Sequence, residues 1–183
     1  MQGESSDMRA EETVSCNARD LACARLLAMQ GEACALTTND ARLPPQTRGR
    51  RLRCALADAR NLPRLMPADA TKEDQERAAL AVFDAWRSAR DGKNPEATPA
   101  ALGAAVNSIQ DMPGGGPYAN ALAADTMVYD VLTEMTSNET DCSKLRQAQQ
   151  LLPASDTRSQ LADRVDSLRL VIQSASAKRS CAA

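Results

Sequence analysis

Six cysteines and no histidine constrain this chain more than any other feature. No Cys-x-x-Cys occurs, so the usual signatures of zinc ribbons, thioredoxin-type redox pairs and c-type haem sites are missing. Without histidine, Cys/His zinc sites and Cys–His catalytic pairs are excluded. We therefore expect structural disulfides, with no metal and no cofactor, and six reduced, buried thiols are the alternative. The disulfide candidates are Cys16, Cys23, Cys34, Cys54, Cys142 and Cys181.

Positions on the expected helices favour two of the possible pairings. Cys23 and Cys54 fall near the middles of two neighbouring helices, which predicts that they pair across an antiparallel hairpin. Cys142 opens a helix and Cys181 follows the last one, so this pair would tie the two ends of a C-terminal hairpin. Cys16 and Cys23 would lie about 10 Å apart along one helix, too far for a bridge.

The expected disulfides imply an oxidising compartment, in a bacterium the periplasm or the exterior. The first residues, MQGESSDMRAEE, have neither the basic n-region nor the apolar h-region of a signal peptide. We expect a mature periplasmic or secreted chain from which the leader has been removed. A cytoplasmic protein is the alternative. No run approaches the roughly 18 apolar residues of a membrane span. A lipid anchor lost together with the leader would fit a scaffold lipoprotein.

The composition predicts an all-α fold. Hydrophobic residues make up 43% of the chain and aromatic residues only 2%, so the apolar content is mostly alanine and leucine, the best helix formers. We expect about seven antiparallel helices in a bundle or a TPR-like array of helical hairpins, braced by disulfides. Residues 1–13 are expected to be disordered, 14–176 to form one helical domain, and 177–183 to form a loose tail unless Cys181 holds it.

Local signals place the expected helix ends. The first helix is expected at Val14–Gln30, stopping near Gly31, and the second is expected to end before Pro63. Thr71 and Thr98 are expected to cap the next two helices at their N-termini.

The same signals place one C-terminus and two apolar faces. Gly92 suits a left-handed position after a helix. Apolar residues at helical spacing predict two buried faces. These are Ala79, Val82, Phe83 and Trp86, and Leu161, Val165, Leu168 and Ile172.

Two sequence patterns suggest chemistry, and neither is specific. The segment PGGGP precedes a helix, but it lacks the lysine and the preceding strand of a phosphate-binding Walker loop, so we interpret it as an interhelical linker. Asp130 and Glu134 stand four residues apart, and two carboxylates can hydrolyse a glycoside without histidine. Sugar sites usually add aromatic platforms, and this chain has one Trp, two Tyr and one Phe.

These observations favour a non-enzymatic protein-binding module of the bacterial envelope. Its most concrete form is an immunity or inhibitor protein that neutralises a secreted toxin or lytic enzyme. The alternatives are a periplasmic scaffold or assembly lipoprotein and, less favoured, a carboxylate-based hydrolase. The net charge of −2 argues against a general nucleic-acid partner. The expected partner contacts are Asn39, Asp40, Arg42, Lys93, Asn94, Glu96, Gly114, Gly115 and Gly116.

Overall fold

The structure is a computed structural model that describes residues 16–17, 19–154 and 160–182. Within these ranges the chain forms seven α-helices and no strand, so the all-α prediction is confirmed. The helices are α2 (Leu21–Thr37), α3 (Pro45–Leu65), α4 (Lys72–Asp91), α5 (Pro99–Asp111), α6 (Gly116–Thr133), α7 (Asn138–Leu151) and α8 (Gln160–Lys178). The expected disorder of residues 1–13 falls outside the described residues.

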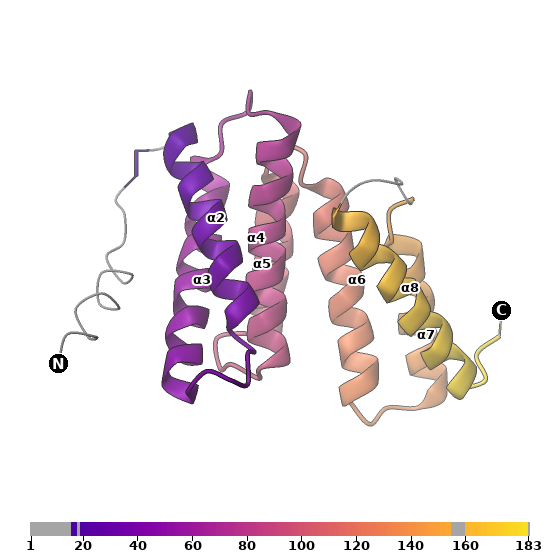
Figure 1. The fold of residues 1–183 in the computed structure, drawn as a ribbon. Helices are drawn as coiled ribbons and strands as arrows, with labels where there is room; N and C mark the ends of the chain where they lie inside the picture. The colour runs from indigo at the N-terminus through magenta and orange to yellow at the C-terminus, as the bar shows by residue number, and fades with distance from the viewer. Residues whose placement is uncertain (1–15, 18, 155–159, 183) are drawn as a thin grey trace. The chain divides into compact units, whose positions relative to one another are not determined.

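The chain divides into two compact units at the PGGGP segment (Figure 1). The first unit ends at Gly115 and contains α2 to α5. The second begins at Gly116 and contains α6 to α8. A single domain over residues 14–176 stays a prediction.

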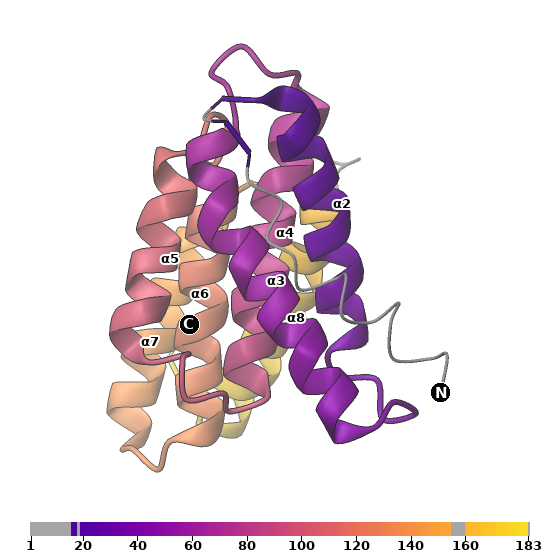
Figure 2. The same cartoon turned by 90° about the vertical axis from the view of Figure 1, so that its left-hand side faces the viewer.

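Helix α4 forms the centre of the first unit and packs against α2, α3 and α5 (Figures 1 and 2). All six residues from Ala78 to Phe83 are buried, which shows that α4 has neighbours around most of its circumference. The expected face formed by Ala79, Val82, Phe83 and Trp86 is buried as predicted. Alanines dominate this core, and their small side chains let the helices approach closely.

Helix α6 packs against α7 and α8 in the second unit. The face of α8 formed by Leu161, Val165, Leu168 and Ile172 is buried, as predicted. Apolar residues on more than one face of residues 117–135 predict that this helix is the most central one. The observed α6 instead ends at Thr133 and leaves Leu132 56% exposed.

Helix α2 differs from the prediction at both ends, and helix α3 differs at its C-terminal end. Helix α2 begins at Leu21, where the Asp20 side chain accepts a hydrogen bond from the Cys23 backbone N–H, and it continues through Gly31. Gly31 lies where a Cβ atom would be only 3.2 Å from the Cβ of Asp58, so close helix packing explains this glycine. Helix α3 likewise passes Pro63 before it ends at Leu65.

The capping predictions are confirmed at two helices and wrong at one position. The side chains of Thr71 and Thr98 accept hydrogen bonds from the backbone N–H groups three residues later. Gly92 has a φ of −78°, so it does not occupy the left-handed region. Lys93 has the left-handed conformation instead, with a φ of 53°, one residue later than predicted.

Two of the cysteine pairs differ from the expectation. Cys34 lies opposite Cys54, with their Cα atoms 6.1 Å apart, so the expected Cys23–Cys54 pair is wrong. Cys23 pairs with Cys16, which the sequence analysis excludes because it places both residues on one helix. Cys16 instead precedes the helix, and a turn with Arg19 at a φ of 61° brings it back towards Cys23.

The third pair, Cys142–Cys181, is confirmed. Helix α8 continues to Lys178, and the Cys181 backbone N–H donates to the Ser176 carbonyl. A loose C-terminal tail was expected unless Cys181 held it, and the Cys142–Cys181 pair does hold it.

Candidate interaction surfaces

The structure brings together two of the three expected contact loops. Asn39, in the loop between α2 and α3, has its Oδ1 atom 3.9 Å from the position that a Cβ on Gly92 would take. Gly92 directly follows α4, so the loops at residues 38–44 and 92–98 share one end of the first unit (Figure 1). We call these two loops the loop end. Gly114 lies at the start of α4, where a Cβ would be 2.6 Å from Gln75 Oε1.

Both acidic side chains of the loop end are paired within the chain. Asp40 accepts hydrogen bonds from the Arg42 backbone N–H and guanidinium, which hold the pKa of this carboxyl below its usual range. Glu96 forms an ion pair with Arg60 at 2.9 Å, and the Arg60 guanidinium lies over the Trp86 ring. The acidic groups of the loop end are therefore neutralised by arginines of the same chain.

A disulfide stands beside the loop end. Cys34 is in the last turn of α2, and its carbonyl accepts a hydrogen bond of 2.9 Å from the Thr38 hydroxyl. Its partner Cys54 lies on α3, beyond the loop, so the bridge closes a 20-residue segment that includes the loop. The Asn94 side chain similarly fixes the other loop by accepting from the Glu96 N–H. Both loops are thus held in one conformation by their own contacts.

The glycines of the third candidate segment have a structural role. Gly114 has a φ of 70°, a left-handed conformation that favours glycine. A Cβ on Gly115 would collide with the Ile109 carbonyl oxygen. Gly116 is the first residue of α6. Contact of these glycines with a partner stays a prediction.

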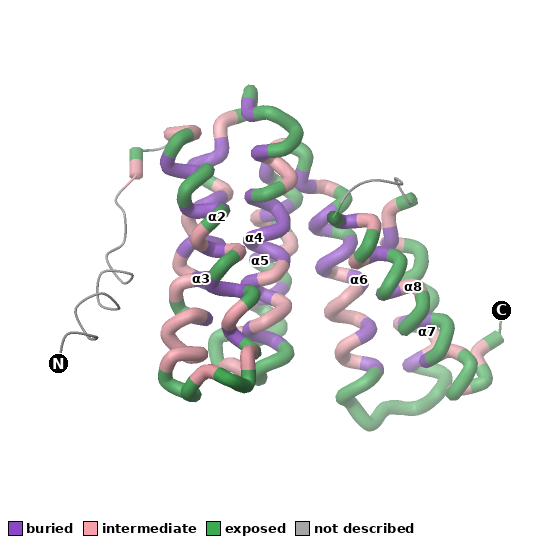
Figure 3. The backbone as a smooth tube through the Cα atoms, in the orientation of Figure 1, coloured by how far each residue is buried: buried purple, intermediate pink, exposed green. Residues whose placement is uncertain are grey.

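Sequence reasoning missed an apolar stripe on the outer face of α2. Leu26, Met29 and Leu36 are 63%, 58% and 70% exposed, and Figure 3 shows exposed and buried residues alternating along α2. Ala22 and Ala33 are exposed on the same face. We call these five residues the α2 stripe. They are spaced by four and three residues alternately, as in the seam of a coiled coil. The sequence does carry a signal for this stripe, because apolar residues occur all around the helix and the core can cover only one side of it.

Helix α2 is anchored from its other side. Its inner face is buried against α3 and α4. The Arg25 guanidinium forms two hydrogen bonds with Asp74 of α4, at 2.9 and 2.8 Å. The bonds from Arg25 and from the Thr71 hydroxyl lower the pKa of Asp74. The α2 stripe therefore belongs to a firmly packed helix.

Asp58 is a buried carboxyl on α3 next to the Cys34–Cys54 bridge. It is 6% exposed, and burial raises its pKa to about 7. The Cys54 sulfur lies 3.9 Å from Asp58 Oδ2, but a sulfur in a disulfide has no hydrogen to donate. The carboxyl therefore takes a proton more readily than an exposed aspartate does.

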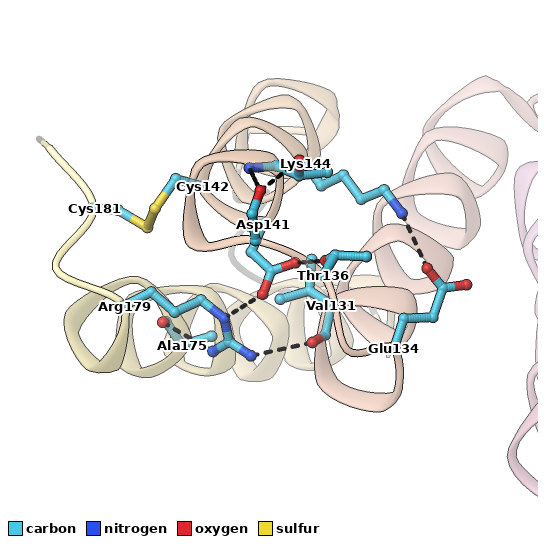
Figure 4. A network of polar contacts seen from close by, with 11 residues as sticks. Val131, Glu134, Thr136, Asp141, Cys142, Lys144, Ala175, Arg179 and Cys181 are labelled. Atoms are coloured by element: carbon cyan, nitrogen blue, oxygen red, sulfur yellow. Dashed lines mark hydrogen bonds and ion pairs between the residues drawn. A yellow bond between two sulfur atoms is a disulfide. The ribbon is translucent and has the colours of Figure 1, made fainter.

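The carboxylates that suggested hydrolysis lie around the end of α6. Glu134 follows the helix, and its carboxylate is 3.5 Å from Lys144 Nζ (Figure 4). Asp130 lies on α6, and its carbonyl accepts from the Glu134 N–H. The ion pair with Lys144 gives Glu134 a structural partner. Catalysis by this pair stays untested.

A polar network next to the Cys142–Cys181 bridge joins the three helices of the second unit (Figure 4). The Asp141 carboxylate accepts from Arg179 Nε at 2.8 Å and from the Thr136 hydroxyl. The Thr136 and Arg179 bonds lower the pKa of Asp141. Arg179 also donates to the carbonyls of Val131 and Ala175. One guanidinium thus connects α6, α7 and α8.

Neither a cluster of metal-binding side chains nor a helix that could cross a membrane is found in the described ranges. Among these residues, no three or more Cys, Asp or Glu side chains gather in a way that could hold a metal ion. No described helix combines the length and apolarity that crossing a membrane requires.

Comparisons of the chain with protein-family models, with curated proteins and with solved structures found no match.

Proposed function

We propose that this chain is a non-enzymatic protein-binding module of the bacterial envelope, and most concretely an immunity or inhibitor protein that neutralises a secreted toxin or lytic enzyme. The observation that carries the proposal is the loop end. Two exposed loops converge there, beside a disulfide and on a helical support. Binding then requires little ordering of the loops, which favours affinity.

The proposal also rests on the compartment. All six cysteines are at disulfide distance in three pairs, and such pairs persist in oxidising spaces such as the periplasm. An antiparallel array of helical hairpins would give the loops a rigid base. Inhibition follows when such a base places the loop end in the entrance of an enzyme's cleft.

A pair of matched double variants tests the loop end. Asn39→Ala/Lys93→Ala removes two exposed side chains from it, and Asp69→Ala/Lys72→Ala removes two exposed side chains near the other end of α4. With each protein as bait, partners are captured from the envelope fraction of the native host. The captured partner is purified, and its affinity and enzymatic activity are measured.

We expect the wild type and Asp69→Ala/Lys72→Ala to bind and inhibit the partner equally. Asn39→Ala/Lys93→Ala should bind at least about tenfold more weakly, as for the loss of central interface contacts. Equal affinity of both variants would reject the loop end, and binding without inhibition would reject the inhibitor role.

One observation favours the scaffold alternative. The α2 stripe exposes several large apolar side chains on a surface helix, which is typical of a protein that works inside an assembly. A scaffold would bind the same partner without changing its activity, so the inhibition assay separates the two roles.

A further inference from the structure

We infer that the α2 stripe is a self-association surface, on which a second copy of this chain docks its own α2 in antiparallel orientation about a two-fold axis at Met29. This inference is independent of the loop end, which is a different surface of the first unit. The spacing, the sizes and the charges of the residues on one face of α2 support it.

The spacing of the stripe selects a helix as the occupant. Successive stripe residues alternate between four and three positions apart, which gives a straight apolar seam along the 17 residues of α2. Such a seam packs into the seam of another helix at a small crossing angle. A strand or an irregular loop would not match this period along the whole length of α2, about 25 Å.

The sizes of the residues select a second copy. In chain order the stripe is alanine, leucine, methionine, alanine, leucine, and in reverse order every alanine meets a leucine. An antiparallel pair therefore places Ala22 opposite Leu36 of the second copy and Leu26 opposite Ala33, with Met29 facing itself. Small residues opposite large ones allow close interdigitation. A two-fold axis requires this kind of self-complementary surface.

The charges beside the stripe agree with the same pairing. Arg25 and Glu32 flank the seam on one side, seven residues apart. An antiparallel partner brings the Glu32 of one copy next to the Arg25 of the other, so opposite charges meet twice. Arg25 bonds to Asp74 through Nε and Nη2 and remains 52% exposed. Glu32 has no ion-pair partner within the part of the chain that the structure describes.

The interface is small, and this sets the expected affinity. One helix from each copy buries less than the roughly 800 Å² per partner of a standard interface. We therefore expect a dissociation constant on the order of 10–100 μM, in the range of weak complexes.

Sedimentation velocity of the full, oxidised chain between about 1 and 500 μM tests the inference, since this range brackets the expected constant. Met29→Arg places two like charges on the axis, and we expect it to raise the dissociation constant at least tenfold. The matched control is Leu170→Arg, at a similarly exposed apolar position on α8, which should leave the constant unchanged. Circular dichroism establishes that both variants are folded.

Cysteine cross-linking tests the orientation without a destabilising charge. A mixture of Ala22→Cys and Leu36→Cys chains should form an intermolecular disulfide on mild oxidation, at least tenfold faster than either variant alone. Peptide mapping identifies the new bond. A wild type that stays monomeric throughout the concentration range overturns the inference, as does equal dimerisation of Met29→Arg and Leu170→Arg. Cross-linking of either single variant as fast as the mixture overturns the antiparallel pairing.

Discussion

Each unit of this protein buries an aspartate next to a disulfide, and the two carboxyls have opposite environments. Asp58 lies beside Cys34–Cys54 with no hydrogen-bond donor in the described contacts except a sulfur that has no proton. Burial raises its pKa to about 7. Asp141 lies beside Cys142–Cys181 and accepts hydrogen bonds from Thr136 and Arg179, which lower its pKa.

The comparison shows that burial alone does not determine what a carboxyl does for stability. The hydrogen-bond donors around the carboxyl decide whether its ionised form stabilises or destabilises the fold. In the first unit, Asp58 favours folding while it is protonated and opposes folding once it is ionised. In the second unit, Asp141 favours folding while it is ionised. The contribution of Asp58 is therefore lost as the pH rises, and the contribution of Asp141 is lost as the pH falls.

Removing one disulfide from each unit should have the largest effect. Cys142→Ala/Cys181→Ala opens a loop of 39 residues and Cys34→Ala/Cys54→Ala a loop of 20. Chain entropy predicts losses of about 4 and about 3 kcal/mol in the free energy of unfolding. Urea titrations of both variants at pH 7 measure the losses. A smaller loss for Cys142→Ala/Cys181→Ala would mean that the Asp141–Arg179 network holds the C-terminus without the bridge.

Asp58→Asn should come next. The folded-state pKa of Asp58 lies above its usual value, so its contribution to stability is fully present below about pH 4 and is lost as the pH rises through 7. The wild type should lose up to about 4 kcal/mol over this range. The variant lacks this loss and should be more stable than the wild type at pH 8. Urea titrations at pH 4, 6 and 8 measure the stability of both proteins. The same dependence on pH in the variant and the wild type would contradict the prediction.

Asp141→Asn should have the opposite sign and a smaller size. At pH 7 the variant leaves Arg179 without its carboxylate, and we expect a fall of roughly 5–10 °C in the Tm. Since the folded-state pKa of Asp141 is lowered, its contribution is present above the usual aspartate pKa and disappears as the pH falls through the folded-state value. The difference between variant and wild type should therefore shrink in acid.

A matched control for this variant is Asp166→Asn, in an exposed ion pair with Arg169. Calorimetry should detect little change for it, because exposed pairs contribute little. Equal shifts for Asp141→Asn and Asp166→Asn would remove the contrast between the units.

Sequence reasoning succeeded where a residue acts on its own neighbours. Thr71 and Thr98 cap helices because a hydroxyl three residues before an N–H needs no distant partner. It failed at Gly31, which resembles a helix stop. There the deciding contact is Asp58, 27 positions away, which would crowd a Cβ atom at this position. The Cys16–Cys23 pair was missed because the Asp20 cap, which starts the helix late, was not recognised.

The surfaces were partly predictable for the same reason. Composition identifies loops such as Asn39–Arg42 and Lys93–Glu96 as exposed, but only the packed helices show that these two share an end and that Gly114 does not. The α2 stripe depends on which side of an apolar helix is covered. The hydrogen bonds between Arg25 and Asp74 and the packing against α4 determine which side is covered. No local sequence pattern reveals these contacts.

All three cross-links stay on their own side of the Gly115–Gly116 boundary. The two halves are therefore joined covalently by a single backbone connection. A protease that cuts in the PGGGP segment would give two separate bands on a gel without reducing agent, and each fragment would keep its own cystines. The cysteine pairs of the first half therefore need no cysteine from the second half.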